Sequence, residues 1–159
     1  MAKFAPFKRI TIDLFFHLFS AFLLSAWIYS ITGNIFYVFI CILGTIFIDL
    51  DHFIDYFLHF KSGFRIGEFL KCNYLHSGKV YLFFHAWEIN LVVLLASIIF
   101  NSTALLILFI SLSTHLLIDS LQRSNPFTYF LLYRKYKNFQ CHILLPEVVR
   151  ERSFFKASS

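Results

Sequence analysis

Histidines and carboxylates recur inside the hydrophobic stretches of this sequence. In several places they stand three or four residues apart, a spacing that puts both side chains on one face of a helix. An ionisable side chain in a membrane-spanning helix costs a few kcal/mol, so it normally faces a cavity and has a function. The sets are Asp13 with His17, Asp49 with Asp51, His52 and Asp55, His85 with Glu88, and His115 with Asp119.

Imidazole and carboxylate groups without thiolates are ligands for zinc, manganese, iron or magnesium. A bound ion can activate water, and two neighbouring ions can clamp a phosphoryl group. We therefore predict one or two divalent ions, with zinc as the first choice. The predicted ligands are His17, Asp51, His52, His85, His115 and Asp119. Asp49 and Glu88 are predicted as ligands or the general base, and His76 as the general acid or a further ligand.

A simpler alternative is that these groups only hydrogen-bond one another and lock the helices together. That outcome is common for a single residue, but it becomes unusual for a set of seven or more at one depth. His59 and His142 lie in predicted loop or interfacial segments, to which no argument from membrane depth applies, and we interpret them as surface residues.

The stretches that carry these residues are typical of membrane helices. The chain has 159 residues, of which 58% are hydrophobic and only 14% charged, with a mean hydropathy of +0.70. A soluble domain is normally about half apolar and a quarter charged. Four stretches approach the ~20 residues that cross a bilayer: Ile10–Thr32, Asn34–Leu50, Val80–Phe100 and Thr103–Leu121. The first resembles a signal peptide, but it is long and lacks a small-residue cleavage site.

The basic residues predict the orientation. All 14 lysines and arginines lie before the first stretch, between the second and third, or after the fourth. By the positive-inside rule the central loop and both termini are cytoplasmic, in a multi-pass protein of the cell inner (plasma) membrane. The net charge of +5 then suits anionic headgroups, and we expect no nucleic-acid partner.

The same boundary gives the depth of the polar residues. His17 and His115 each lie eight residues from a boundary arginine, or ~12 Å along a helix. His85 lies six residues past Lys79, or ~9 Å at the same rise. Helices of alternating direction thus bring their histidines to one level near the cytoplasmic face.

These observations predict an all-α integral membrane protein with about four transmembrane helices and interfacial amphipathic segments. We assign residues 1–125 to a four-helix membrane domain with the metal site, and 126–159 to a cytoplasmic or interfacial tail rich in basic and aromatic residues. The central loop Phe53–Tyr74 is expected to lie along the membrane surface. Cys41, Cys72 and Cys141 form no CxxC pair, so structural disulfides are not expected.

The ordered motifs resemble the YdjM-type family of inner-membrane metal-dependent hydrolases, also described as LexA-binding and membrane-associated. The resemblance covers Ile10 to about Asp119 and is carried by His17, Asp49-Leu50-Asp51-His52, His76-Ser77, and His115 with Asp119. Family members often have H-R-G-x-T-H-S before the third helix, where this chain has Asn73-Tyr74-Leu75-His76-Ser77. One histidine of that pattern is missing, and His85 with Glu88 are the expected replacements.

We therefore expect a membrane-embedded metal-dependent hydrolase that cleaves an ester or phosphoester, in a lipid or small amphiphile, at the cytoplasmic leaflet. Lys79 and Arg123 would bind its anionic headgroup, with snorkelling as the alternative role of Lys79. A metal or proton transporter would need polar residues through the full membrane depth, whereas the outer halves here are apolar. A non-catalytic protein with a structural metal site is the other alternative. The sequence does not determine the oligomeric state.

Overall fold

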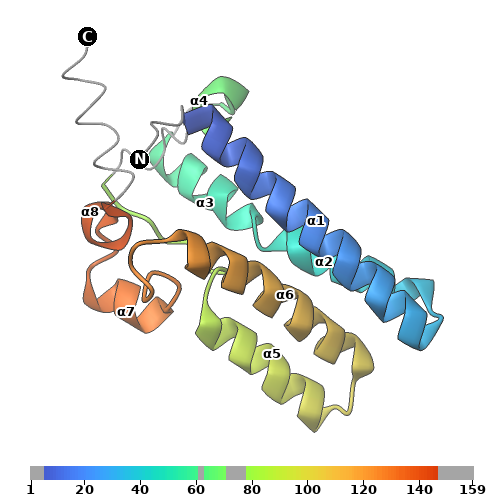
Figure 1. Ribbon diagram of the computed structural model, residues 1–159. Helices are drawn as coiled ribbons and strands as arrows, with labels where there is room; N and C mark the ends of the chain where they lie inside the picture. Colours follow the sequence, from blue (N-terminus) through green and yellow to red (C-terminus); the bar gives the residue numbers. More distant parts are fainter. Residues whose placement is uncertain (1–5, 61–62, 71–77, 147–159) are drawn as a thin grey trace.

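The computed structural model describes residues 6–60, 63–70 and 78–146, which form helices and no strand. The helices are α1 (Pro6–Thr32), α2 (Ile35–Phe47), α3 (Leu50–His59), α4 (Ile66–Leu70), α5 (Trp87–Ile99), α6 (Thr103–Gln122), α7 (Leu131–Tyr136) and α8 (Cys141–Leu144). Figure 1 shows α1, α2, α5 and α6 running alongside one another, with α3, α4, α7 and α8 gathered at one end. The all-helical class predicted from the sequence is confirmed for these residues.

Three of the described helical segments are long and apolar enough to cross a membrane. They are Ile12–Thr32, the α2–α3 segment Ile35–His59, and Thr103–Gln122. The fourth predicted span, Val80–Phe100, is wrong in its first third, because only Trp87–Ile99 is helical. A helix of 13 residues is ~20 Å long, against the ~30 Å of a bilayer core.

Two tight turns join the long helices at the end opposite α7 and α8 (Figure 1). The first follows α1, where Gly33 has a φ of 62°, and the Asn34 side chain then accepts from a backbone N–H of α2. The second contains Asn101 with a φ of 47°, followed by Ser102, whose side chain caps α6. Asparagine and glycine are the residues that adopt this left-handed backbone most readily, so the sequence itself ends these helices.

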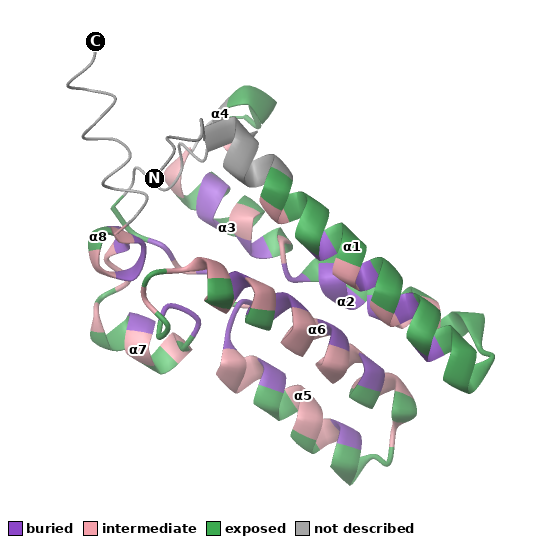
Figure 2. Ribbon diagram, viewed as in Figure 1, coloured by how far each residue is buried: buried purple, intermediate pink, exposed green. Residues whose placement is uncertain are grey.

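Helix α6 packs against α1, α2 and α5. Buried positions line the facing surfaces of the helices, and exposed positions cover the outside of α1 (Figure 2). At Gly44 of α2 an added Cβ would lie 2.9 Å from side-chain atoms of α6. Next to it, the Ser111 hydroxyl donates to the Cys41 carbonyl at 2.6 Å and contacts the Thr45 hydroxyl at 3.0 Å. Small residues that let two backbones approach are typical of helix contacts in membranes.

The segment Ile35–His59 is broken between α2 and α3, at Ile48 and Asp49. The backbone N–H of Asp49 donates to Ile46, three residues earlier, and the N–H of His52 donates to Asp49 in the same way. Such tighter turns inside a helix often mark functional positions. Here the break falls at the start of the Asp49–His52 motif and redirects its side chains.

The described part of the tail packs on the loop that precedes α5. Lys79 pairs with Gln140 in an isolated antiparallel bridge, and Val80 donates to the carbonyl of Phe139 at 2.9 Å. Val80, Tyr129 and Leu144 share one buried cluster with Leu116 of α6. The division at residue 125 stays a prediction, but residues 126–146 support the loop instead of standing apart.

Candidate metal centre

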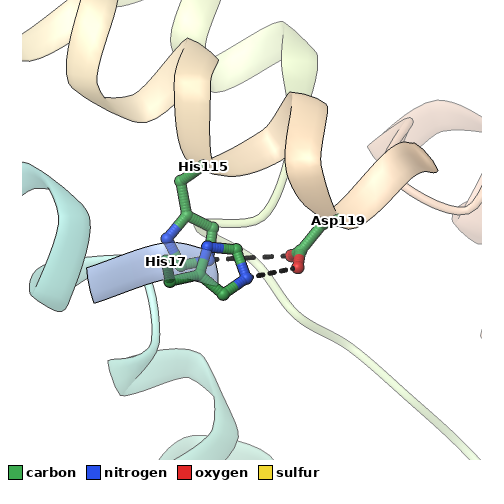
Figure 3. A group of neighbouring side chains, drawn as sticks. All are labelled: His17, His115 and Asp119. Atoms are coloured by element: carbon green, nitrogen blue, oxygen red, sulfur yellow. Dashed lines mark hydrogen bonds and ion pairs between the residues drawn. The ribbon is translucent and has the colours of Figure 1, made fainter. Parts of the chain in front are cut away.

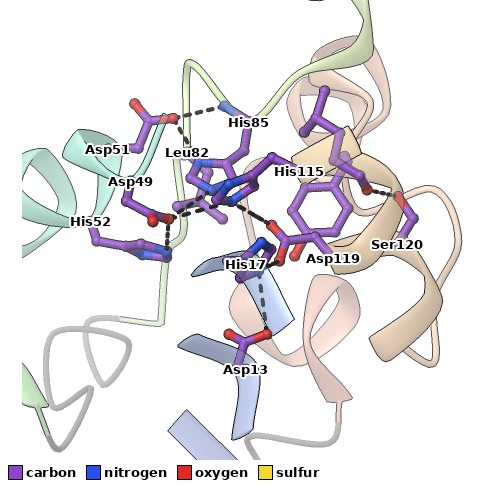
Figure 4. Close-up of polar contacts among 12 residues, drawn as sticks. Asp13, His17, Asp49, Asp51, His52, Leu82, His85, His115, Asp119 and Ser120 are labelled. Carbon is purple, nitrogen blue, oxygen red and sulfur yellow. Dashed lines mark hydrogen bonds and ion pairs between the residues drawn. The ribbon is translucent and has the colours of Figure 1, made fainter. Parts of the chain in front are cut away.

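Four histidines and two aspartates from different parts of the chain meet at one place (Figure 4). The Asp49 Oδ1 atom, at the α2–α3 break, lies 3.5 Å from the Nε2 atoms of both His85 and His115. The Nε2 atom of His52 lies 3.9 Å from the same oxygen. The loop before α5 and two helices therefore converge on Asp49, as the shared depth of these residues predicted.

His17 of α1 joins the cluster from the other side (Figure 3). Its Nε2 atom lies 3.0 Å from Asp119 Oδ1 and 3.4 Å from Asp13 Oδ1. The second oxygen of Asp119 lies 3.7 Å from His115 Nε2. The His17 and His115 rings stack with their centroids 3.9 Å apart. The helical i, i+4 pairs of α1 and α6 thus face each other across the bundle.

The ligand atoms fall into two neighbouring groups, each of which could hold a metal ion. One group is His17, His115 and Asp119, and the other is Asp49, His52 and His85. Within each group the candidate ligand atoms lie within 4.8 Å of one another. Asp49 also contacts His115, and Asp119 also contacts His85 at 3.6 Å. Each aspartate therefore touches both groups, an arrangement that suits either one ion or two.

The distances within the cluster fit shared ions better than hydrogen bonds. An N–H···O hydrogen bond is about 2.7–3.2 Å long, whereas four of the contacts between these rings and carboxylates measure 3.5, 3.5, 3.6 and 3.7 Å. Two ligands that each lie ~2.1 Å from a tetrahedral zinc ion are ~3.4 Å apart. The spacing is therefore close to the edge of a metal coordination shell.

Buried ring nitrogens support the same interpretation. His85 Nε2 and both nitrogens of His115 have no hydrogen-bond partner among the described residues. A buried polar atom without a partner is unfavourable and is rare in native proteins. A divalent ion would give the two Nε2 atoms the partner that they lack. The residues present therefore fit a metal ion bound by imidazole and carboxylate.

Asp51, which the sequence predicted as a ligand, lies behind His85. Its Oδ2 atom accepts from the His85 backbone N–H at 2.8 Å and lies 3.1 Å from His85 Nδ1. Metal-binding histidines commonly donate their second ring nitrogen to a carboxylate, which fixes the ring and raises its basicity. This geometry makes Asp51 an orienting residue, and it leaves His85 Nε2 directed at Asp49.

Arg134 of α7 also supports His85, and sequence analysis did not single it out. It is fully buried, and its guanidinium donates to the carbonyls of Leu82 and His85, the latter at 3.0 Å. Burial lowers the pKa of Arg134 to about 10, so the group stays charged at neutral pH. Nothing in the local pattern separates this arginine from its exposed neighbours, because the contact spans about fifty residues of sequence.

The other predicted residues lie outside the cluster or outside the described residues. Both oxygens of Glu88 accept from the first N–H groups of α7, on Leu131 and Leu132, at 2.9 and 3.1 Å. The predicted helical pairing of His85 with Glu88 is wrong, because His85 lies before α5 and Glu88 supports α7. His76 falls outside the described residues.

Of the predicted headgroup residues, Lys79 lies in the loop before α5 and Arg123 directly follows α6. Lys79 is exposed at the start of the loop, and the Arg123 Nε–H donates to the Tyr129 hydroxyl at 3.0 Å. Neither the exposure of Lys79 nor the hydrogen bond of Arg123 tests a role in binding an anion. His142 is exposed and His59 half-buried, so neither joins the cluster.

One side of the cluster is accessible. The side chains of His17, His85, His115 and Asp119 are all at least nine-tenths buried, whereas Asp49 is 44% and His52 29% exposed. Asp13, which is partly exposed, contacts His17 one turn along α1. A site built in this way has a buried floor and an open edge.

No protein-family model matches the chain, and neither a curated protein nor a solved structure is similar to it. The resemblance to the YdjM-type family stays a prediction that rests on the motifs alone.

Proposed function

We propose that this chain is a membrane-embedded, metal-dependent hydrolase that cleaves an ester or phosphoester of a lipid at the cytoplasmic leaflet. One observation carries the proposal: histidines and aspartates from α1, the α2–α3 break, the loop before α5 and α6 converge with the spacing of metal ligands. The three membrane-length helices support a membrane location, and the basic boundary residues support cytoplasmic termini.

The chain's own residues divide the chemical roles between them. His17, His115 and Asp119 on one side, and His52, His85 and Asp49 on the other, would hold one or two divalent ions, of which zinc suits the donor set best. A divalent ion in such a site polarises the bond to be cleaved and makes water a nucleophile near neutral pH. Asp51 fixes the ring of His85. Asp49 is the carboxylate at the open edge and is placed to take a proton from water.

The open edge favours a catalytic site over a structural one. A structural metal site is closed by protein ligands on all sides, while a catalytic site keeps a position open. Here the partly exposed side chains of Asp49 and His52 border the place where a substrate would approach. The family resemblance is consistent with this proposal, since it also implies a metal-dependent hydrolase.

A lipid is the substrate class that fits the position of the site. The predicted depth of ~9–12 Å below the basic boundary is about where the ester and phosphate groups of an inner-leaflet lipid meet its acyl chains. Lys79 and Arg123 lie at the boundary end of the helices and would steer the anionic head. A soluble substrate would more naturally be bound by a site that projects into water.

The transporter alternative gains no support from the contact between α2 and α6. A pathway for ions needs polar groups with room between them through the membrane. At Gly44 the helices approach so closely that even a methyl group would meet α6 atoms at 2.9 Å. The hydroxyls of Thr45 and Ser111 at this level are bonded to each other and to the Cys41 carbonyl.

The proposal is tested by incubating purified, zinc-loaded protein with vesicles of phosphatidylglycerol and phosphatidylethanolamine and comparing the lipids by mass spectrometry. We expect the wild type to release a hydrolysis product. His115→Ala should lose both bound metal and turnover, and His142→Ala, which alters an exposed histidine, should keep both. Asp49→Asn should lose turnover, and its metal content shows whether Asp49 also holds the ion.

Two results would overturn the proposal. The first is that no lipid changes with protein loaded with zinc, manganese or magnesium, and that peptides and soluble phosphoesters are also untouched. The second is equal metal content in the wild type, His115→Ala and His142→Ala, which would reduce the cluster to hydrogen bonds between helices.

A further inference from the structure

An apolar groove lies directly on the membrane side of the metal centre, between α1 and α2. It has a volume of about 200 Å³ and is lined on α1 by Leu18, Ala21 and Ser25, and on α2 by Ile42, Thr45 and Ile46. None of the roles assigned to the metal centre uses it.

On both helices, the residues that line the groove are close in sequence to residues of the candidate metal centre. Leu18 follows His17 in the chain, and Ile46 stands three residues before Asp49. From Leu18 to Ser25 the groove follows α1 over seven residues, which is ~10 Å at the helical rise. It therefore leads from the ligands towards the outer half of the membrane.

We propose that this groove holds one acyl chain of a membrane lipid whose ester or phosphate lies at the metal centre. The inference rests on the proposed function for the placement of the reacting group. Both helices belong to segments that can cross a membrane, so hydrocarbon surrounds the groove. Two of the apolar side chains that line it are exposed, Phe22 at 68% and Ile46 at 54%.

The dimensions favour a chain over a second helix. A helix with its side chains is about 10–12 Å across, whereas the groove is a space of about 200 Å³ between two helices of the same chain. We therefore infer that a single hydrocarbon chain fits this space between two neighbouring helices better than a further helix does.

The fold leaves the groove incompletely filled. Ser25 is only 7% exposed, yet its hydroxyl has no hydrogen-bond partner among the described residues. Thr45, on the opposite wall, already bonds to Cys41 and Ser111. Ala21, between Ser25 and the cluster, is buried and small. A larger side chain at position 21 or 25 would block the groove, and position 25 lies about two helical turns from His17, the nearest candidate ligand on α1.

The experiment uses the purified full chain in detergent, mixed at a low lipid-to-protein ratio with phosphatidylglycerol that carries a diazirine in the middle of one acyl chain. After illumination, mass spectrometry locates the labelled residues. We expect labelling at 18–25 and 42–46 in preference to the equally apolar end of α5. Ala21→Phe and Ser25→Leu should each lower groove labelling by about tenfold, the effect of a steric penalty of ~1.4 kcal/mol.

Matched controls separate filling of the groove from other effects. Leu23→Phe enlarges an exposed residue of α1 and should leave groove labelling unchanged. Ser25→Ala removes the hydroxyl without filling the space, so labelling should persist. Retained metal in Ala21→Phe and Ser25→Leu shows that each variant is folded.

Three outcomes would overturn the assignment. They are labelling spread evenly over all exposed apolar faces, labelling that survives both enlarging substitutions, and a loss in Ser25→Ala as large as in Ser25→Leu. Labelling needs no turnover and should persist in His115→Ala. Groove labelling without lipid hydrolysis would therefore refute the proposed function alone, and hydrolysis with an unlabelled groove would refute this inference alone.

Discussion

Replacing Asp51 with asparagine should weaken metal binding without abolishing it. Asp51 Oδ2 accepts from the His85 backbone at 2.8 Å and lies 3.1 Å from its Nδ1 atom, so it orients the ring and does not face the ion. Asparagine keeps an acceptor oxygen but loses the charge that makes the imidazole basic. Loss of such an outer partner typically lowers metal affinity ~10–100-fold, which is ~1.4–2.8 kcal/mol.

The assay is a competition titration of zinc between the detergent-purified protein and a chromophoric chelator. Asp55→Asn is the matched control, because Asp55 lies one turn further along α3 and accepts from the Tyr81 backbone at 3.0 and 3.2 Å. Asp55 holds the same loop but contacts none of the described histidine rings, so the zinc affinity of Asp55→Asn should stay near that of the wild type. His115→Ala marks the full loss expected when a ligand is removed.

Two results would refute the assignment of Asp51. If Asp51→Asn binds as little zinc as His115→Ala, Asp51 is itself a ligand, as the sequence motif predicts. If Asp51→Asn and Asp55→Asn both bind zinc like the wild type, the contact with His85 does not affect the metal. Thermal unfolding of each variant checks that a loss of zinc does not come from a loss of fold.

Three further predictions concern packing, support and topology. Gly44→Val should lower the free energy of unfolding by ~1–3 kcal/mol, the usual effect of overpacking, because the valine Cβ would lie 2.9 Å from α6 atoms. Thermal unfolding in detergent measures this change, and an unchanged midpoint would contradict the prediction. Arg134→Gln should weaken zinc binding by releasing the loop before α5, while Lys135→Gln, at an exposed neighbour, should not. A reporter at Lys71 should lie in the cytoplasm and one at Asn101 outside; a shared compartment refutes the positive-inside orientation.

The long helices could be predicted because local signals determine them. The predicted spans Ile10–Thr32 and Thr103–Leu121 agree closely with α1 and α6. Continuous apolar composition predicts the helices, and the Gly33–Asn34 turn and the Ser102 cap end them. The convergence of His17 and His115 followed from their equal distances to the basic boundary, since antiparallel helices of equal rise must bring them level.

The loop before α5 could not be predicted, because its stability comes from distant residues. The sequence from Val80 to Phe84 is apolar, and composition alone does not distinguish a buried helix from a buried loop. Irregular buried backbone is stable only where other groups satisfy its N–H and C=O atoms. Here Asp51 and Asp55 accept its N–H groups, and Arg134 donates to its carbonyls. No local pattern shows these partners.

Charge balance links the carboxylates of the candidate metal centre to the proposed chemistry. Asp51 and Asp119 bring two buried carboxylates to one region, beside the partly exposed Asp49, and a desolvated carboxylate requires a cation. Protonated histidines could supply the charge, but a charge-assisted N–H···O bond is about 2.7–2.9 Å long. The His17–Asp119 contact, at 3.0 Å, is near this length. The contacts of His85 and His115 with Asp49, at 3.5 Å, are not. Two rings share that one oxygen at a distance typical of neighbouring metal ligands. A divalent ion would therefore account for both the charge and the spacing, whereas protonation accounts only for the charge.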